Sequence, residues 1–355
     1  MVLKLRGKHT LADFLNDTFA LVPRIWKRAL PVSVAAYLPG VALMVAAIGS
    51  LTGMVNSAIA DSEIFAHKPS MIFSSLAPFV WLCVLASLAL YLGRSFQKAY
   101  VCAEAGAAIA GRKPRFLELL RSTGRGAFLR VAVQDFAIKS LSGILAFAII
   151  GLLFFPVLIG KMAGLVDAGI EKSKVGLIVS LIAVYLASIL LAAAASWWIA
   201  VKTAVSAPAA TLEGVNSFAG IGRSLDLVRG RSWRVFGAMF IVSLVISFGL
   251  GIVTGPITFI VILPGYFSFL KESLSGNSPS PGTIIAFLSS ISWAIGVSML
   301  VSGVVQGALW PSFLTLLHAD LRIRAGELEP SAEDEPAPPA IAEVPSEGSG
   351  DGALG

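Results

Sequence analysis

Four arginines surround a tryptophan in the stretch GRSLDLVRGRSWRVFGAM, which ends at Met239. A guanidinium group can hold a phosphate through two parallel hydrogen bonds, and an indole ring suits the boundary between lipid and water. The residues that would bind the anionic headgroup of a membrane lipid are Arg229, Arg231, Trp233 and Arg234. In the alternative interpretation, these side chains only anchor the chain at the membrane surface and set its topology.

Gln306 is the deepest strongly polar side chain in the last long apolar stretch, and two interpretations of it are open. It shares a helix face with small residues, which favours close packing between helices; these are Ala294, Ser298 and Ser302. In the other interpretation, Gln306 lies on the wall of a cavity that holds a solute. Two glycine pairs at GxxxG spacing also predict close helix contacts, namely Gly303 with Gly307 and Gly251 with Gly255.

Charged residues are scarce inside the apolar stretches, which is where a transport or proton-relay site is usually found. Asp135 and Lys139 are four residues apart at the start of one stretch and predict a local ion pair. The histidines are scattered, and the sequence has no HExxH, GxSxG or GxxxxGK[ST] motif. We therefore expect no enzyme activity, no metal and no other cofactor.

The composition shows which elements must carry these residues. Of the 355 residues, 56% are hydrophobic and 14% are charged, whereas a soluble domain carries about 25% charged residues. Six uncharged runs reach the ~20 apolar residues that cross a bilayer, namely Ala29–Ala60, Ser70–Gly93, Ser140–Gly160, Val175–Val201, Val235–Leu270 and Ser273–Leu317. The sequence therefore predicts an all-α polytopic membrane protein with six transmembrane helices.

The fifth run is longer than one span requires, and its second half contains Pro256, Pro264 and several glycines. Because proline and glycine interrupt helices, we expect Val235–Ile257 to span the membrane and Thr258–Phe269 to form an apolar outer loop or an interfacial segment. The last span is expected to begin near Thr283.

The basic residues indicate the orientation of the chain. The segments before, between and after the spans hold 22 Lys and Arg on one side and 5 on the other. The positive-inside rule therefore places the N-terminus and the C-terminus in the cytoplasm. Because the basic residues are spread over segments beside the membrane, the net charge of +6 needs no nucleic acid as a partner.

A threefold internal repeat is predicted from three basic amphipathic segments that precede alternate spans. We call these segments the feet, and they are Phe14–Arg28, Phe116–Arg130 and Ile221–Arg234. Each foot ends in an aromatic residue followed by Arg or Lys, and these aromatic residues are Trp26, Phe128 and Trp233. The repeat units cover about 11–113, 115–214 and 215–326, and each contains a foot and two spans. Three parallel hairpin repeats with cytoplasmic amphipathic feet would then surround a pseudo-threefold axis along the membrane normal.

The chain divides into a membrane domain, 1–326, and a C-terminal tail, 327–355. The tail is acidic and rich in proline, a composition that cannot bury enough apolar surface to order itself. We expect a disordered cytoplasmic segment, and in the alternative it docks a protein partner.

Two quoted segments, SFAGIGRSLDLVRGRSWRVFGAMFIV and LLHADLRIRAGELE, resemble a known family. They are similar to the membrane domain of bacterial glycerophosphoryl diester phosphodiesterases and to YciC-like inner-membrane proteins. The closing DLRIR motif corresponds to 320–324. The resemblance implies a multi-pass protein of the bacterial cytoplasmic membrane with a link to phospholipid or glycerophosphodiester metabolism. The catalytic barrel has no counterpart here, so the resemblance does not imply phosphodiesterase activity.

Three functions remain open from the sequence. The first is a non-enzymatic membrane protein that binds anionic lipid or a membrane partner through its feet. The second is a transporter or permease for a lipid-like or small amphiphilic solute, with Gln306 in its cavity. The third is an assembly or scaffold factor whose tail recruits proteins. The oligomeric state is not determined by the sequence.

Overall fold

The computed structural model describes residues 11–60, 69–167, 174–276 and 279–328. This part of the chain is helical and confirms the predicted all-α class. In chain order its elements are α1 (Leu11–Ala60), α3 (Pro69–Ile109), α4 (Phe116–Ser122), the π-helical turn η1 (Thr123–Ala127), α5 (Phe128–Asp167), α6 (Lys174–Lys202), α7 (Ser206–Leu212), α8 (Ser217–Val228), α9 (Ser232–Leu274) and α10 (Pro281–Arg324).

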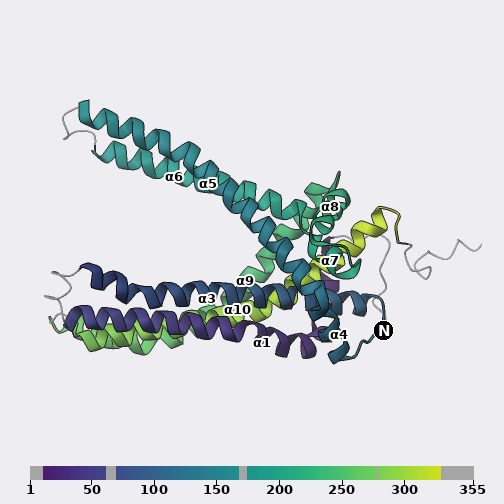
Figure 1. Cartoon of the computed structure of the whole chain (residues 1–355), viewed down its shortest axis with the longest axis horizontal. Coiled ribbons are helices and arrows are strands. Elements are labelled where there is room, and N and C mark those ends of the chain that lie inside the picture. The colour runs from purple at the N-terminus through teal and green to yellow at the C-terminus, as the bar shows by residue number, and fades with distance from the viewer. Residues whose placement is uncertain (1–10, 61–68, 168–173, 277–278, 329–355) are drawn as a thin grey trace, which may run out of the picture.

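Six of these helices, α1, α3, α5, α6, α9 and α10, contain stretches long and apolar enough to cross a membrane. They pair in sequence order as three hairpins, and the first and third hairpins pack together. We call α1, α3, α9 and α10 the four-helix body. The α5–α6 hairpin contacts the body near its base, and its distal half stands apart from it (Figure 1). The predicted threefold repeat stays a prediction, and the three hairpins are packed unequally.

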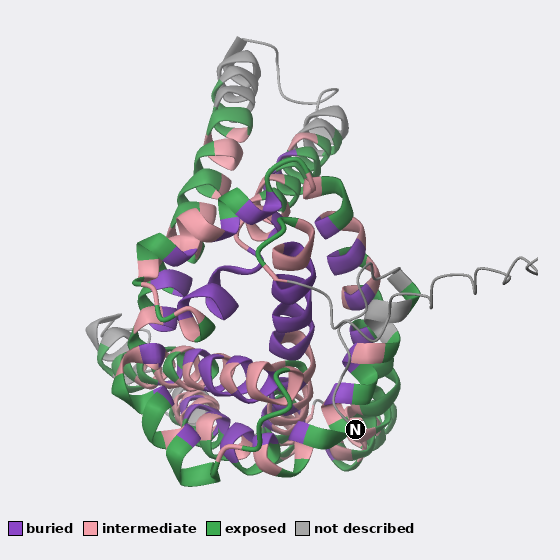
Figure 2. Ribbon diagram, turned by 90° about the vertical axis from the view of Figure 1, so that its right-hand side faces the viewer, coloured by how far each residue is buried: buried purple, intermediate pink, exposed green. Residues whose placement is uncertain are grey.

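The most tightly packed part of the molecule lies at the end where α1 begins and α10 ends, which we call the terminal side. Eleven consecutive residues of α10, 311–321, are buried there. The ends of α1 and α3 and the short helices α7 and α8 surround them. Figure 2 looks at this end and shows buried residues gathered at its centre. Because these helix ends extend past the apolar runs, the core holds the hairpins together at one membrane surface.

The predicted outer loop at Thr258–Phe269 is wrong, because α9 continues without a break to Leu274. A proline removes only its own N–H from a helix, and packing against a neighbouring helix compensates for that loss. Here the Phe269 ring stacks on Phe287 of α10, with ring centroids 5.3 Å apart. Gly265 lies against the same part of α10, where a Cβ would meet Ser290 and Phe287. The predicted start of the last span near Thr283 is confirmed within two residues.

The three feet differ from one another. The first foot is continuous with its span in α1. The second bends at Gly126 within η1, and the third turns at Gly230, whose φ is 75°. The ends of the three units are more alike, because each closes at a glycine with positive φ: Gly111 and Gly214 at 70° and Gly326 at 76°. The predicted tail lies outside the described residues except for its first two positions.

Candidate functional site

A cavity of about 850 Å³ lies inside the ring of spanning helices, and we call it the central cavity. All six spanning helices contribute to its wall. The lining residues of α5 fall at 135–142, near the start of that helix, and those of α6 fall near its end. The cavity therefore occupies the terminal half of the bundle and is open rather than enclosed.

Three cations line this cavity, and we call Arg94, Lys98 and Lys139 the cation cluster. Lys98 Nζ lies 2.7 Å from Asp135 Oδ1, so this carboxylate joins α5 to α3. The predicted ion pair between Asp135 and Lys139 is therefore wrong, since Asp135 pairs with Lys98 instead. Lys139 Nζ instead lies over the ring of Tyr91, 4.9 Å from its centroid. The Tyr91 hydroxyl donates a hydrogen bond to the carbonyl of Ala132 and is thereby fixed in place.

The cation cluster carries more positive charge than the cavity wall neutralises. Asp135 is the one carboxylate among the described lining residues, and it is taken up by Lys98. Arg94 has no hydrogen bond or ion pair among the described residues, and its side chain is exposed to the cavity. The wall therefore holds two surplus positive charges, which suits an anionic group.

Neutral polar groups complete the wall of the central cavity. Gln306 is exposed and lines the cavity, as one of its two predicted interpretations requires. Gln97 Nε2 donates to Ser33 Oγ at 2.5 Å. Gln97 Oε1 and Trp197 Nε1 are buried and have no hydrogen-bond partner in the described part of the chain. Buried polar atoms are normally paired, so one acceptor and one donor among the lining residues are left without partners.

The wall becomes less polar away from the terminal side. Its lining there includes Met44, Leu90, Ile246 and Met299. The three cations and Asp135 lie on the terminal side of these residues, whereas the wall further in along the spans carries no charge, and its polar members there are serines such as Ser87 and Ser247. The cavity is thus amphipathic along the membrane normal.

The four residues predicted to bind lipid headgroups lie outside this cavity, at the start of α9. Arg231 donates to the carbonyl oxygen of Arg324 at 2.8 Å. Arg234 lies 3.6 Å from the buried carboxylate of Asp320. Arg229 is exposed at the turn after α8, and Trp233, which is 75% exposed, contacts Trp198 edge to face. Arg231 and Arg234 therefore connect the basic foot to the closing DLRIR motif.

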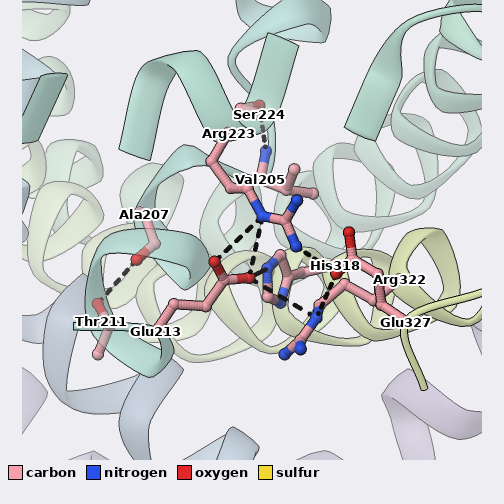
Figure 3. Close-up of polar contacts among 9 residues, drawn as sticks. All are labelled: Val205, Ala207, Thr211, Glu213, Arg223, Ser224, His318, Arg322 and Glu327. Carbon is pink, nitrogen blue, oxygen red and sulfur yellow. Dashed lines mark hydrogen bonds and ion pairs between the residues drawn. The ribbon is translucent and has the colours of Figure 1, made fainter. Parts of the chain in front are cut away.

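A second polar cluster lies beneath the cavity on the terminal side, and we call it the terminal polar cluster (Figure 3). At its centre, Glu213 accepts a hydrogen bond from His318 at 3.0 Å and from Arg223 at 3.1 Å. Arg223 and Arg322 also pair with Glu327. These contacts tie the end of the second hairpin to α8 and to the end of α10.

The hydrogen bond from His318 and the charge of nearby Arg223 lower the pKa of Glu213 from 4.5 to about 2. A carboxyl with a lower pKa in the folded chain stabilises the fold at pH values above its unfolded pKa. That stabilisation declines as the pH falls from about 4.5 toward 2.

Replacing Glu213 with Gln should therefore lower the free energy of unfolding at pH 7 by about 1–3 kcal/mol, because charge-assisted hydrogen bonds are lost. The difference from the wild type should shrink as the pH falls below 4.5. Thermal unfolding in detergent micelles at pH 7 and at low pH measures both effects. Glu118→Gln, an exposed change on α4, is the matched control and should alter neither. A Glu213→Gln deficit that is equal at both pH values would contradict the assigned role of the charge.

Sequence reasoning did not identify Arg94 and Lys98 as site residues. A signal for them is present: they stand four residues apart just after the second uncharged run, and Asp135 and Lys139 stand four apart just before the third. Both pairs are thus at the same predicted membrane boundary, in consecutive helices.

The six spanning helices and their shared cavity define the class: a multi-pass helical membrane protein with a cationic, amphipathic cavity. Comparisons with protein-family models, curated proteins and solved structures find no match for the chain.

Proposed function

We propose that this membrane protein binds an anionic amphiphile in its central cavity and performs no chemistry on it. The observation that carries the proposal is the surplus charge of Arg94 and Lys139 on the cavity wall. Two cations that line one cavity without a carboxylate of their own repel each other, and a bound anion removes that repulsion. A negatively charged headgroup would neutralise both.

The depth of the cation cluster supports a lipid-like ligand. Arg94 directly follows the second uncharged run, and Lys139 directly precedes the third. Both therefore lie near the level of lipid headgroups. Arg94 offers a planar fork and Lys139 a point charge, a combination that suits a phosphate. The apolar part of the wall then accommodates the hydrophobic portion of the ligand.

The resemblance to the membrane domains of glycerophosphoryl diester phosphodiesterases supports the same ligand class. Phospholipids and their glycerophosphodiesters both carry an anionic phosphate. We accordingly place the protein in the bacterial cytoplasmic membrane, with both termini in the cytoplasm, as part of this proposal.

Transport of the same amphiphile is the second candidate function. Gln306 favours transport, because this polar side chain is exposed on the cavity wall well inside the last span. A lipid bound only at the membrane surface would have no polar group at that depth, whereas a headgroup that crosses the membrane would pass it. Movement of a labelled amphiphile across reconstituted vesicles distinguishes transport from binding alone.

Native mass spectrometry from lipid nanodiscs tests the binding proposal. With equal amounts of phosphatidylglycerol and phosphatidylcholine, we expect about one phosphatidylglycerol retained per chain, with a preference of about tenfold, equivalent to ~1.4 kcal/mol. Equal retention of the anionic and the zwitterionic lipid would rule out an anion-selective site.

A further inference from the structure

The α5–α6 hairpin is poorly covered by the rest of the protein. The most apolar 18-residue window of α5 contains no buried residue. Its distal half and that of α6 stand away from the four-helix body (Figure 1). Within a bilayer, lipid chains must cover the apolar side chains that face this separation, because contact between water and these side chains would be unfavourable.

Helix geometry connects the cavity wall to these uncovered side chains. Residues seven and eleven positions apart share a helix face, so the face of Trp197 on α6 continues through Leu190 and Leu186. Both leucines are exposed, Leu190 to 71%. On α5 the face of Ser142, which lines the cavity, continues through the exposed Leu145. An apolar stripe thus leads out of the cavity along both helices of the hairpin.

The stripe has the dimensions of an acyl chain in one leaflet. Trp197 and Leu186 are 11 residues apart, which is about 16 Å along a helix that rises 1.5 Å per residue. Half of the ~30 Å hydrocarbon core of a bilayer is about 15 Å. A lipid whose headgroup lies at the cation cluster would therefore extend its chain along this stripe at the ordinary depth of its leaflet.

Building on the proposed function, we infer that the ligand is an anionic phospholipid of the leaflet on the terminal side, and that it reaches the cavity sideways. Its phosphate lies against Arg94 and Lys139, and one acyl chain lies along Leu186 and Leu190 between the hairpin and the four-helix body. The commitment to a bilayer lipid, rather than a soluble anion, follows from the continuity of the stripe with the cavity. The surplus charge of the cation cluster matches the anionic headgroup of such a lipid, and the apolar stripe matches its acyl chain.

Photo-crosslinking tests this route. The full chain is placed in nanodiscs with phosphatidylglycerol that carries a photoactivatable diazirine in its acyl chain. We expect crosslinked peptides to include Leu186 or Leu190. A second variant, Ser142→Trp, places a bulky ring on the cavity wall beside the α5–α6 hairpin and should lower both the crosslinking and the retained phosphatidylglycerol by about tenfold. Ile144→Trp is the matched control, because Ile144 is exposed on the opposite side of α5 and should have no effect.

The outcomes separate this inference from the proposed function. A wild type that shows no preference for phosphatidylglycerol would overturn both the proposed function and the sideways route. A wild type that retains the lipid, together with a Ser142→Trp variant that retains it equally, would overturn only the sideways route. Crosslinks confined to the outer face of α5, around Ile144, would also overturn it.

Discussion

Replacing Arg94 and Lys139 together with Gln should weaken phosphatidylglycerol binding by roughly 100-fold, the largest effect expected for any change in the cavity. Each side chain would lose a charge-assisted hydrogen bond worth about 1.5 kcal/mol or more. The Lys98–Asp135 pair, which joins α3 to α5, is kept intact in this variant. Lipid retention by native mass spectrometry, titrated against phosphatidylcholine, measures the loss.

The matched control removes two positive charges from the same side of the molecule but outside the cavity. Arg121 and Arg125, in α4 and η1, are both exposed. Their replacement by Gln should change lipid binding by no more than about twofold, because exposed charges are screened by salt. Equal losses in the two double variants would show general surface attraction instead of a cavity site.

The foot hypothesis is tested in the same assay. Arg229→Gln removes an exposed arginine of the predicted headgroup site without touching the contacts of Arg231 or Arg234. If lipid selectivity disappears in Arg229→Gln and persists in the cavity variant, the binding site is the foot and the cavity proposal fails.

The apparent melting temperature of the Arg94 and Lys139 double variant should not fall. Neither side chain has an ion pair in the described part of the chain, so neutralising both leaves no carboxylate unpaired. This separates a lost ligand contact from a damaged fold.

The spans could be predicted from the sequence because they depend on a local property, the length of uncharged apolar runs. The error at Thr258–Phe269 has a physical origin as well. Proline and glycine break an isolated helix, but α9 is not isolated, since Phe269 and Gly265 pack along α10. A contact between helices overrode a local preference.

The pairing within the cation cluster could not be predicted, because it forms only when α3 and α5 meet. Along the chain, Lys139 is the nearest opposite charge to Asp135, whereas in the fold Lys98 is closer. The same limit applies to the third foot. In the sequence, an arginine that will face a lipid phosphate cannot be distinguished from one that will pair with Asp320, as Arg234 does. Only the packing of α9 against the end of α10 distinguishes them.

Of the two GxxxG pairs predicted to lie at close helix contacts, one does and one does not. Gly303 and Gly307 were expected at close helix contacts, and this is confirmed, since a Cβ would meet Tyr37 at the first and Gln97 at the second. For Gly251 and Gly255 the expectation is wrong, because a Cβ at either would have no atom within 4 Å among the described residues. Spacing alone does not tell which face of a membrane helix meets another helix.

Gly93→Ala should destabilise the protein strongly, although Gly93 belongs to no GxxxG pair. A Cβ at Gly93 would lie 2.0 Å from the carbonyl oxygen of Ala36 and 2.8 Å from its carbon. These are backbone atoms of α1, which cannot rotate away as a side chain can. The two helices would have to separate, at a cost of about 3 kcal/mol, the upper part of the range for overpacking. The apparent melting temperature in detergent micelles measures it.

Gly251→Ala is the matched control, and its effect should have the opposite sign. Alanine in a helix interior is more stable than glycine by about 0.5–1 kcal/mol, and the new methyl group at this position meets open space. A Gly93→Ala variant as stable as the wild type would mean that α1 and α3 lie further apart than described. Because Tyr37, next to Ala36, lines the central cavity, separation of these helices should also weaken phosphatidylglycerol retention, which Gly251→Ala should leave unchanged.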